Sequence, residues 1–369
     1  MKTIRIAQIG SGFISGVHVS SFGKLEGVEV VCQHDNDTVR GKAFCKKFEI
    51  PDHVTSFEEV LKRDDVDAVS LGLPNFLHFE FAMKAAAAGK HVICEKPLAL
   101  RIDQAEEMID TCKKQGLVLG YAEELCYIPK YEHAKQVAEA GGIGDVFLVR
   151  QHEKHGGAYS PWFFQADTAG GGILMDMGCH AIECCRWLLG KPAIKSVYCQ
   201  ADLFLHKQIT KLDDHIMMII EFETGQVAQV ESSWTLQGGM ISFVEIQGTE
   251  GVVHANLLQD GMGLTVYSEK GYELASDVLG VAGSDKGWHH PSWEWLWQNG
   301  YPQEMKDFVT CMREGGTPRE SGEDGLVVLQ IMIAGYQSAA IGQKVMFPFK
   351  DPGGYNTPVE IWLKARGEM

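Results

Sequence analysis

The chain has 369 residues, of which 45% are hydrophobic and 22% are charged, and its formal net charge at pH 7 is −16. This length is sufficient for two domains with sizeable cores, and the composition is that of an ordinary soluble globular protein. The acidic excess argues against a nucleic-acid or anionic-membrane partner, because clustered Lys and Arg would be needed for either.

The sequence gives no indication of secretion or of a membrane span. The first residues run directly into a strand pattern, without the apolar core and cleavage site of a signal peptide. No apolar run approaches the roughly 18 residues of a spanning helix. The ten cysteines include no Cys-x-x-Cys pair, so neither a zinc ribbon nor a thioredoxin-like motif is indicated. We therefore expect a cytoplasmic protein with reduced, mostly buried thiols.

A glycine-rich turn follows the first predicted strand. Residues 4–9 alternate in polarity, and a Gly-x-Gly-x-x-Ser sequence follows at residues 10–15. In a dinucleotide-binding fold the first glycine allows a tight turn, the second lets a pyrophosphate approach the backbone, and the serine permits close helix–sheet packing. Amides at the following helix N-terminus would then hold the phosphates. The residues expected to contact the cofactor here are Gly10, Gly12, Phe13 and Ile14.

The second predicted strand, residues 28–32, ends near Asp35. An acid in this place hydrogen-bonds the adenosine ribose in dinucleotide folds. Asp35 would repel a 2′-phosphate, so we expect NAD rather than NADP as the cofactor. Arg40, expected one turn into the next helix, weakens this preference. Asp35 could also be a plain loop acid in the polar run 34–37.

Helix and strand signals continue to alternate after this strand. Ser56 with Glu59, and Asp103 with Glu106, have the spacing of helix caps. A third short strand, residues 67–71, leads to Pro74 and Asn75, with His78 in the first turn of the next helix. Asn75 is most simply a helix cap. His78 is either a satisfied helix-end histidine or a neighbour of the cofactor.

The most informative strand lies within residues 89–98. A helix ends at Gly89, apolar positions follow, and the strand finishes with Glu95, Lys96 and Pro97. In open α/β sheets ligands bind at the carboxyl ends of strands, and the proline biases Lys96 toward an extended conformation. The alternative is a strand-ending ion pair beside a proline turn. With one more strand at 117–120, the alternation predicts a doubly wound parallel sheet.

The pattern changes after residue 122. A helix over about 129–140 is followed by closely spaced strand signals, which predict a mostly antiparallel sheet. These strands are residues 146–152, 194–201, 216–222, 227–234, 241–247 and 252–255. We therefore expect an α/β protein with an N-terminal dinucleotide-binding domain over 1–122 and a second α/β domain over 123–369.

Residues 170–190 interrupt this strand series with an apolar segment that begins with three glycines. If the segment is helical, Asp176 and His180 lie one turn apart on the same face. The alternative is a local hydrogen bond between them on a buried helix. Further along, residues 288–297 are rich in tryptophan and contain His290, while residues 302–313 and 322–341 are expected to be helical, the latter buried.

These motifs together resemble the Gfo/Idh/MocA family, named for glucose–fructose oxidoreductase and inositol dehydrogenase. The resemblance covers essentially the whole chain and rests on residues 10–12, 89–98 and 170–190, supported by Pro74, Asn75, His78 and Ser233-Trp234. It implies an N-terminal Rossmann domain, an open C-terminal sheet that often mediates oligomers, a nicotinamide cofactor, and a sugar or polyol substrate between the domains.

The resemblance also implies roles for individual residues. The run Glu95-Lys96-Pro97 would contact the nicotinamide side of the cofactor, and Lys96 would also reach the reacting hydroxyl. Asp176 would orient the substrate, and His180 would be the general acid/base. Two features depart from the family pattern. The first is that Glu123-Glu124 replace a basic or Asn-containing segment. The second is two segments that are not general family marks and are expected to set specificity, which contain Glu153, His155, Tyr159, Trp162 and His290.

These features predict an NAD-dependent dehydrogenase acting on a secondary hydroxyl of a sugar, cyclic polyol or glycoside, with oxidation at carbon 3 of a glucoside as one form. Lys96, near a cationic nicotinamide, is expected to have a lowered pKa. Two related alternatives are a redox-neutral enzyme that recycles its NAD during lyase, epimerase or glycosidase chemistry, and a nucleotide-binding regulator. A metal hydrolase would use His155, Asp176, His180 and His290, but these residues do not have the sequence spacing of metal ligands.

Overall fold

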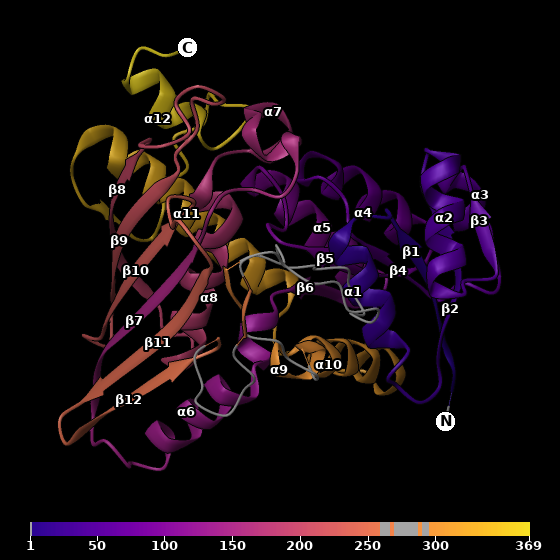
Figure 1. Cartoon of the computed structure of the whole chain (residues 1–369), viewed down its shortest axis with the longest axis horizontal. Helices are drawn as coiled ribbons and strands as arrows, with labels where there is room; N and C mark the ends of the chain where they lie inside the picture. Colours follow the sequence, from indigo (N-terminus) through magenta and orange to yellow (C-terminus); the bar gives the residue numbers. More distant parts are fainter. Residues whose placement is uncertain (1, 259–265, 269–286, 290–294) are drawn as a thin grey trace.

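Two β-sheets organise the chain, and helices pack against both of them (Figure 1). The computed structural model describes residues 2–258, 266–268, 287–289 and 295–369. Trp288 and His289 are described only as part of a short strand, and the predicted site residue His290 lies outside the described residues.

The first sheet has six parallel strands in the order β3-β2-β1-β4-β5-β6, which confirms the predicted doubly wound arrangement. The central strand β4 and the edge strand β6 are buried at every position, as expected for a parallel sheet covered on both faces. The three-residue edge strand β3 was not predicted. The strands are β1 (Ile4–Ile9), β2 (Val28–His34), β3 (Asp52–Val54), β4 (Ala68–Leu71), β5 (His91–Glu95) and β6 (Leu119–Ala122).

Helices connect these strands, and the strand order reverses between β1 and β4. Ligands of open α/β sheets bind outside the carboxyl ends of the strands at such a reversal. The turn after β1, the turn after β4 and the end of β5 therefore border one crevice. The connecting elements are α1 (Phe13–Phe22), α2 (Thr38–Phe48), α3 (Phe57–Leu61), the 3-10 turn η1 (Asn75–Leu77), α4 (His78–Ala87) and α5 (Ile102–Lys114).

The second sheet has seven strands in the order β12-β11-β7-β10-β9-β8-β15. Among the strand pairs of this sheet in the described residues, only β10–β7 is parallel, which confirms the predicted mostly antiparallel sheet. Burial alternates along β8 and β9, so one face packs on the core. The strands are β7 (Val146–His155), β8 (Ile194–Asp202), β9 (His215–Phe222), β10 (Val227–Ser233), β11 (Met240–Gly248), β12 (Gly251–Asn256) and β15 (Val345–Met346), and a separate pair is β13 (Val266–Ser268) and β14 (Gly287–His289).

The helices of the second part pack on both sheets. Met305 and Phe308 of α10 pack against Ile4 and Ile6 of β1, so the last third of the sequence returns to the first sheet. The domain boundary at residue 122 stays a prediction. The elements are η2 (Glu124–Tyr127), α6 (Pro129–Glu139), η3 (Pro161–Phe164), α7 (Ala166–Ala169), the π-helical η4 (Leu174–Gly178), α8 (Cys179–Leu188), α9 (Trp295–Gln298), α10 (Tyr301–Glu314), α11 (Gly322–Ile341) and α12 (Glu360–Ala365).

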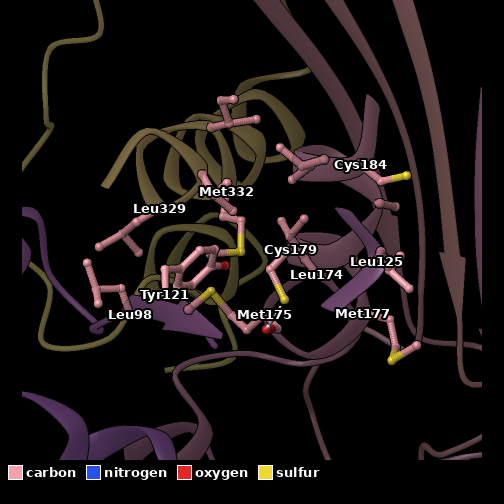
Figure 2. Packing of buried hydrophobic residues seen from close by; sticks show 14 of the residues in the cluster. Leu98, Tyr121, Leu125, Leu174, Met175, Met177, Cys179, Cys184, Leu329 and Met332 are labelled. Atoms are coloured by element: carbon pink, nitrogen blue, oxygen red, sulfur yellow. Dashed lines mark hydrogen bonds between the residues drawn. The ribbon is translucent and has the colours of Figure 1, made fainter. Parts of the chain in front are cut away.

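Within the described residues, α11 is the one helix long and apolar enough to cross a membrane, but more than half of its apolar window is buried inside the molecule. It packs against α5, α8, α12 and β8. Figure 2 shows Leu329 and Met332 of this helix packed toward Tyr121 of the first sheet and Met175 of η4. This shared core couples the two sheets behind the site. All ten cysteines are buried free thiols, as predicted.

Two of the three predicted helix caps are wrong, and the third is confirmed only in its position. Ser56 is the N-cap residue of α3, as predicted, but its hydroxyl donates to the Glu58 carboxylate and accepts no amide of the helix. Arg101, not Asp103, is the N-cap residue of α5, and the Asp103 carboxylate forms a bidentate ion pair with this arginine at 2.6 and 2.8 Å. Asn75 donates its side-chain amide to the Ala169 carbonyl oxygen at 2.8 Å, so it connects the β4 turn to the second part of the chain.

Candidate active site

The turn after β1 has the shape that a pyrophosphate requires. Gly10 has a φ of +93°, and a Cβ there would overlap the Gly72 carbonyl oxygen. Open space lies beside Gly12, at the start of α1, and no side chain caps the first α1 amides. Ser15 packs closely, with its hydroxyl 3.3 Å from the same Gly72 oxygen. The turn therefore fits a dinucleotide phosphate at the helix N-terminus, beside Phe13 and Ile14.

Asp35 lies just beyond β2, buried and hydrogen-bonded. Its carboxylate accepts bonds from Ser11 Oγ and from Arg40 Nε and Nη2, the latter at 3.0 and 2.8 Å. Burial raises the pKa of Asp35, but these bonds outweigh it and the net pKa is lowered. The carboxylate is therefore ionised, and Arg40, in the first turn of α2, is engaged by it.

His78 occupies a buried position between two backbone turns. Its Nδ1 lies 2.8 Å from the Pro97 carbonyl oxygen and its Nε2 3.0 Å from that of Leu73. Burial lowers the pKa of His78. It thus links the Pro74 turn to the turn after β5, which is the position of a satisfied helix-end histidine. Its contact with a cofactor stays a prediction.

Glu95 and Lys96, at the end of β5, do not pair with each other through their side chains. Glu95 Oε1 lies 2.9 Å from His18 Nε2, and the other nitrogen of that histidine is 2.8 Å from Ser70 Oγ. Burial raises the pKa of Glu95, but His18 outweighs it and the net pKa is lowered. Lys96 Nζ instead crosses to Asp176. The alternative of a strand-ending ion pair is therefore wrong, because each side chain finds a separate partner.

Asp176 is the centre of the charged cluster. Lys96 Nζ lies 2.8 Å from its carbonyl oxygen and 3.3 Å from Oδ1, and Trp234 Nε1 donates to Oδ2 at 2.9 Å. His155 Nε2 lies 3.6 Å from the same Oδ2, and its Nδ1 accepts from the Gly157 amide, which we take to place the ring proton on Nε2. Burial raises the pKa of Asp176, but Lys96 and these donors hold it far below its usual range.

The pKa of Lys96 is raised, which makes the predicted lowering wrong. Burial alone lowers this pKa, as expected from desolvation. The charges of Asp176, Glu95 and Glu124 act in the opposite direction, and the net pKa is raised. Lys96 therefore remains an ammonium ion that donates hydrogen bonds.

The backbone around Asp176 is fixed by Asp213, which sequence reasoning missed. The Asp213 carboxylate accepts the amides of Gly172 and Leu174 at 3.0 and 2.9 Å and the Tyr336 hydroxyl at 2.7 Å. A Cβ at Gly172 would overlap the Asp213 carbonyl oxygen, which explains the third glycine of the motif. Asp213 therefore holds the start of η4, and with it Asp176, against the second sheet.

His180, one turn beyond Asp176, faces the acidic pair that departs from the family pattern. Its Nδ1 lies 2.8 Å from Glu123 Oε1 and 3.6 Å from Glu124 Oε2. Burial lowers the pKa of His180 to about 4 and raises that of Glu123. The alternative of a local hydrogen bond between Asp176 and His180 is wrong, because their polar atoms bind other groups.

The remaining predicted substrate residues are spread around this cluster. Glu153 is buried and accepts from Gln151 Nε2 at 2.5 Å and from Ser242 Oγ. Trp162 stacks on Phe163 with ring centroids 3.8 Å apart, whereas Phe164 packs against Trp234. The role of Trp234 was indicated only by family resemblance.

Possible metal ligands gather at places other than the set of residues that a metal hydrolase would use, a function that the sequence did not support. Within the described ranges, two groups of three such side chains come close enough to share an ion, and neither is the proposed hydrolase set of His155, Asp176, His180 and His290. One is Glu123, Glu124 and His180, where the histidine nitrogen already faces a carboxylate. The other contains Glu183, Glu320 and Asp324, whose charges Lys191 and Arg186 neutralise.

A turn that fits a dinucleotide phosphate, a buried acid after the second strand and a lysine–aspartate–histidine cluster at the carboxyl edge of a parallel sheet are the arrangement expected of an NAD-dependent oxidoreductase. The sequence profile described as an oxidoreductase family with an NAD-binding Rossmann fold matches residues 4–123, and the profile of its C-terminal alpha/beta domain matches residues 135–347. The chain belongs to this Gfo/Idh/MocA family, which confirms the predicted family, fold class and cofactor.

Several characterised relatives span almost the whole chain. GenD2 from gentamicin A biosynthesis, solved in complex with NAD, is 32% identical with a TM-score of 0.87, covering 94% of this chain and 97% of that one. Levoglucosan dehydrogenase of Pseudarthrobacter phenanthrenivorans is 29% identical, covering 92% of this chain and 97% of the relative. D-glucoside 3-dehydrogenase of Escherichia coli is 25% identical, with 93% and 97% covered.

Proposed function

We propose that this protein oxidises a secondary hydroxyl of a sugar, cyclic polyol or glycoside with NAD. The observation that carries the proposal is the convergence of Lys96, Asp176 and His180 at the carboxyl end of β5, beside the crevice that fits the cofactor. Secondary-alcohol oxidation needs an oriented donor for the hydroxyl oxygen and a base for its proton, and these three side chains supply both.

NAD, when bound, accepts the hydride from the carbon that carries the hydroxyl. The first glycine turn and the α1 amides hold its pyrophosphate, and Asp35 holds the adenosine ribose. Glu95 and Lys96, at the end of β5, border its nicotinamide side. Because Glu95 is anchored by His18, its backbone fixes the direction in which Lys96 leaves the strand.

Lys96 acts as a permanent hydrogen-bond donor in this mechanism. Its ammonium group donates to the reacting hydroxyl oxygen and stabilises the negative charge that develops there. Asp176 keeps the ammonium in place, and its ionised carboxylate accepts a neighbouring hydroxyl of the substrate. Trp234 and His155 hold that carboxylate from the opposite side.

His180 is the base that takes the hydroxyl proton. With a pKa of about 4 it is neutral at physiological pH, so it can accept a proton without first losing one. Glu123 faces Nδ1, and among the described residues no protein group binds Nε2, which leaves that nitrogen to the substrate.

The substrate class follows from relatives named for levoglucosan and D-glucosides. Oxidation at carbon 3 of a glucoside is one form of the proposal. A panel of inositols, free sugars and glycosides, followed at the absorbance band of NADH, tests it. Oxidation of at least one member supports the proposal, and no oxidation of any member contradicts it. Co-purified nucleotide without net NADH formation would instead support a redox-neutral enzyme that recycles its NAD.

We further propose a cytoplasmic homo-oligomer. The ten free thiols are compatible with a reducing compartment. The outer face of the second sheet exposes several apolar side chains that a second copy of the chain would cover. These are Phe147, Tyr198, Met217, Ile219, Val252 and Met346.

Substituting Asp35 should change the cofactor preference. In Asp35→Ser the adenosine ribose of NAD loses its hydrogen-bond acceptor. Arg40 is released from its ion pair with Asp35, so the Arg40 guanidinium becomes available to the 2′-phosphate of NADP. We expect the NADP-to-NAD ratio of kcat/KM to rise about tenfold or more, the factor expected for one hydrogen bond to a charged group. Steady-state kinetics with both cofactors measure the ratio. In Asp35→Ser/Arg40→Ala the gain with NADP should vanish, and a gain that persists would contradict this role of Arg40.

Glu123 is expected to act as a positioning residue for His180. Glu123→Gln should lower kcat by about tenfold to a hundredfold with little change in KM, because the imidazole loses the carboxylate that fixes its tautomer and orientation. Glu123→Asp should restore part of the loss, and Glu139→Gln, on the exposed side of α6, should behave as wild type. Equal losses in the Gln and Asp variants with a raised KM would indicate a merely structural role.

A further inference from the structure

Two loops beside the charged cluster expose apolar side chains together. One is residues 156–165, which follow β7, and the other is residues 203–209, which follow β8. Tyr159 is 77% exposed and Ile209 60% exposed, and Phe204 and Leu205 are also exposed. Single exposed apolar residues are ordinary, but a contiguous group marks a binding surface.

These loops enclose a cavity of about 460 Å³, lined by residues 158–161, Phe164, Gln165 and Ile209. That volume lies in the range of small-molecule sites, roughly 300–1,000 Å³. No charged side chain is among the lining residues. Its mostly apolar walls carry polar side-chain groups at Tyr159, Ser160 and Gln165, none of them charged, so the cavity favours a flat, uncharged ligand.

The loops are held in place by defined contacts. The Asp214 carboxylate accepts the amides of Phe204, Leu205 and His206 at 2.7 to 3.0 Å. Thr210 Oγ1 donates to the Phe164 carbonyl oxygen at 2.9 Å and ties the two loops together. The exposed apolar side chains therefore project from an ordered backbone, which reduces the entropy lost on binding.

Two aromatic contacts connect the cavity to Asp176. The Tyr159 ring stacks on His155, with centroids 5.1 Å apart and planes 18° apart, and His155 contacts Asp176. Phe164 packs edge-on against Trp234, with centroids 5.5 Å apart, and Trp234 donates to Asp176. The walls of the cavity thus contact the two side chains that bind Asp176, beside the place where the reacting hydroxyl would lie.

Tyr159 also lies within the electrostatic field of the site. Desolvation by the surrounding loop raises the pKa of its phenol, and the Asp176 carboxylate raises it further. Most of the ring surface is exposed, and one face of the ring stacks on His155. Its other face is free to stack on a ligand.

We propose that this cavity binds the flat apolar aglycone of a glycoside whose sugar ring lies at Lys96 and Asp176. The inference rests on the proposed function and narrows its substrate class to glycosides with an apolar, preferably aromatic, aglycone. A protein partner is disfavoured, because a stable interface buries on the order of 1,200 Å² or more of surface. The few residues that line this cavity offer far less surface than that.

The test compares kcat/KM for 4-nitrophenyl glucoside, methyl glucoside, glucose and myo-inositol, with NADH formation as the readout. We expect the wild type to prefer the aryl over the methyl glucoside by about tenfold to a hundredfold, the factor expected for burying one aromatic ring. The preference should shrink severalfold in Tyr159→Ala and in Ile209→Ser. Ile341→Ser, at an isoleucine of similar exposure at the end of α11, should keep the wild-type preference.

The outcomes separate this inference from the proposed function. If no sugar, polyol or glycoside is oxidised, the proposed function fails. If the wild type oxidises methyl glucoside, glucose or inositol but gains nothing from the aryl group, only the aglycone site is overturned. Unchanged preference in both loop variants would also overturn it. The aglycone site would also be overturned if Tyr159→Ala changed the oligomeric state, measured by light scattering, but left the preference for the aryl glucoside unchanged. That result would mean that a second copy of the chain covers the loops.

Discussion

Lys96→Met should lower kcat by about a thousandfold while NAD still binds. In the proposed mechanism the ammonium group is the donor that stabilises charge on the reacting oxygen. Losing one such preorganised donor costs roughly 10²–10³ in turnover, with a further loss expected from the substrate misalignment that follows. The contacts proposed for NAD at Gly10, Gly12 and Asp35 are made elsewhere, so the cofactor dissociation constant, measured by fluorescence titration, should change little.

A matched control separates loss of chemistry from loss of folding. Lys84→Met removes an exposed lysine on α4 that pairs with Glu80, and it should turn over as wild type. Thermal unfolding of Lys96→Met must remain cooperative, since Asp176 keeps its bonds from Trp234 and its contact with His155. Near-normal turnover of a folded Lys96→Met would contradict the assignment of this lysine.

His180→Asn should reduce turnover by about 10²–10⁴-fold, the usual contribution of a general base. The wild-type pH profile provides the sharper test. In the proposed mechanism the base is the neutral imidazole of His180, and its lowered pKa keeps it neutral until the pH falls toward about 4. For oxidation, kcat/KM should therefore stay level from neutral pH downward and decline only as the pH approaches about 4.

The variant and a control complete this prediction. The residual activity of His180→Asn should lack the acid limb, whereas His254→Asn, an exposed histidine on β12, should retain it. A wild-type limb near the ordinary histidine value of 6.5, or an unchanged limb in His180→Asn, would assign the proton transfer to another group.

The fold was accessible from the sequence because its signals are local. The turn at Gly10 and Gly12 identified the first βα unit, and the helix end at Gly89 placed β5 correctly. Short edge elements were missed, since β3 and β15 have only three and two residues and depend on pairing with a neighbour. The predicted cap at Asp103 failed because the neighbouring Arg101 binds the Asp103 carboxylate, and a charged donor is a stronger partner than a backbone amide.

The site was only partly predictable, because its contacts join distant parts of the chain. Helical spacing brought Asp176 and His180 together correctly, but it could not show that their partners are Trp234 and Glu123. The predicted direction of the Lys96 pKa shift was wrong, because a sequence pattern does not show how many carboxylates lie around one ammonium group in the fold. The structural role of Asp213 could not be predicted, because in the sequence this residue is only an acid that precedes a predicted strand.

Transfer of deuterium tests the central claim most directly. The protein is incubated with NAD and the best substrate of the panel, deuterated at its ring carbons, and the reduced cofactor is analysed by mass spectrometry. The proposed mechanism predicts deuterium on the nicotinamide of NADH, slower turnover than with the unlabelled substrate, and loss of both signals in Lys96→Met. Oxidised product formed with unlabelled NADH would contradict hydride transfer at this site.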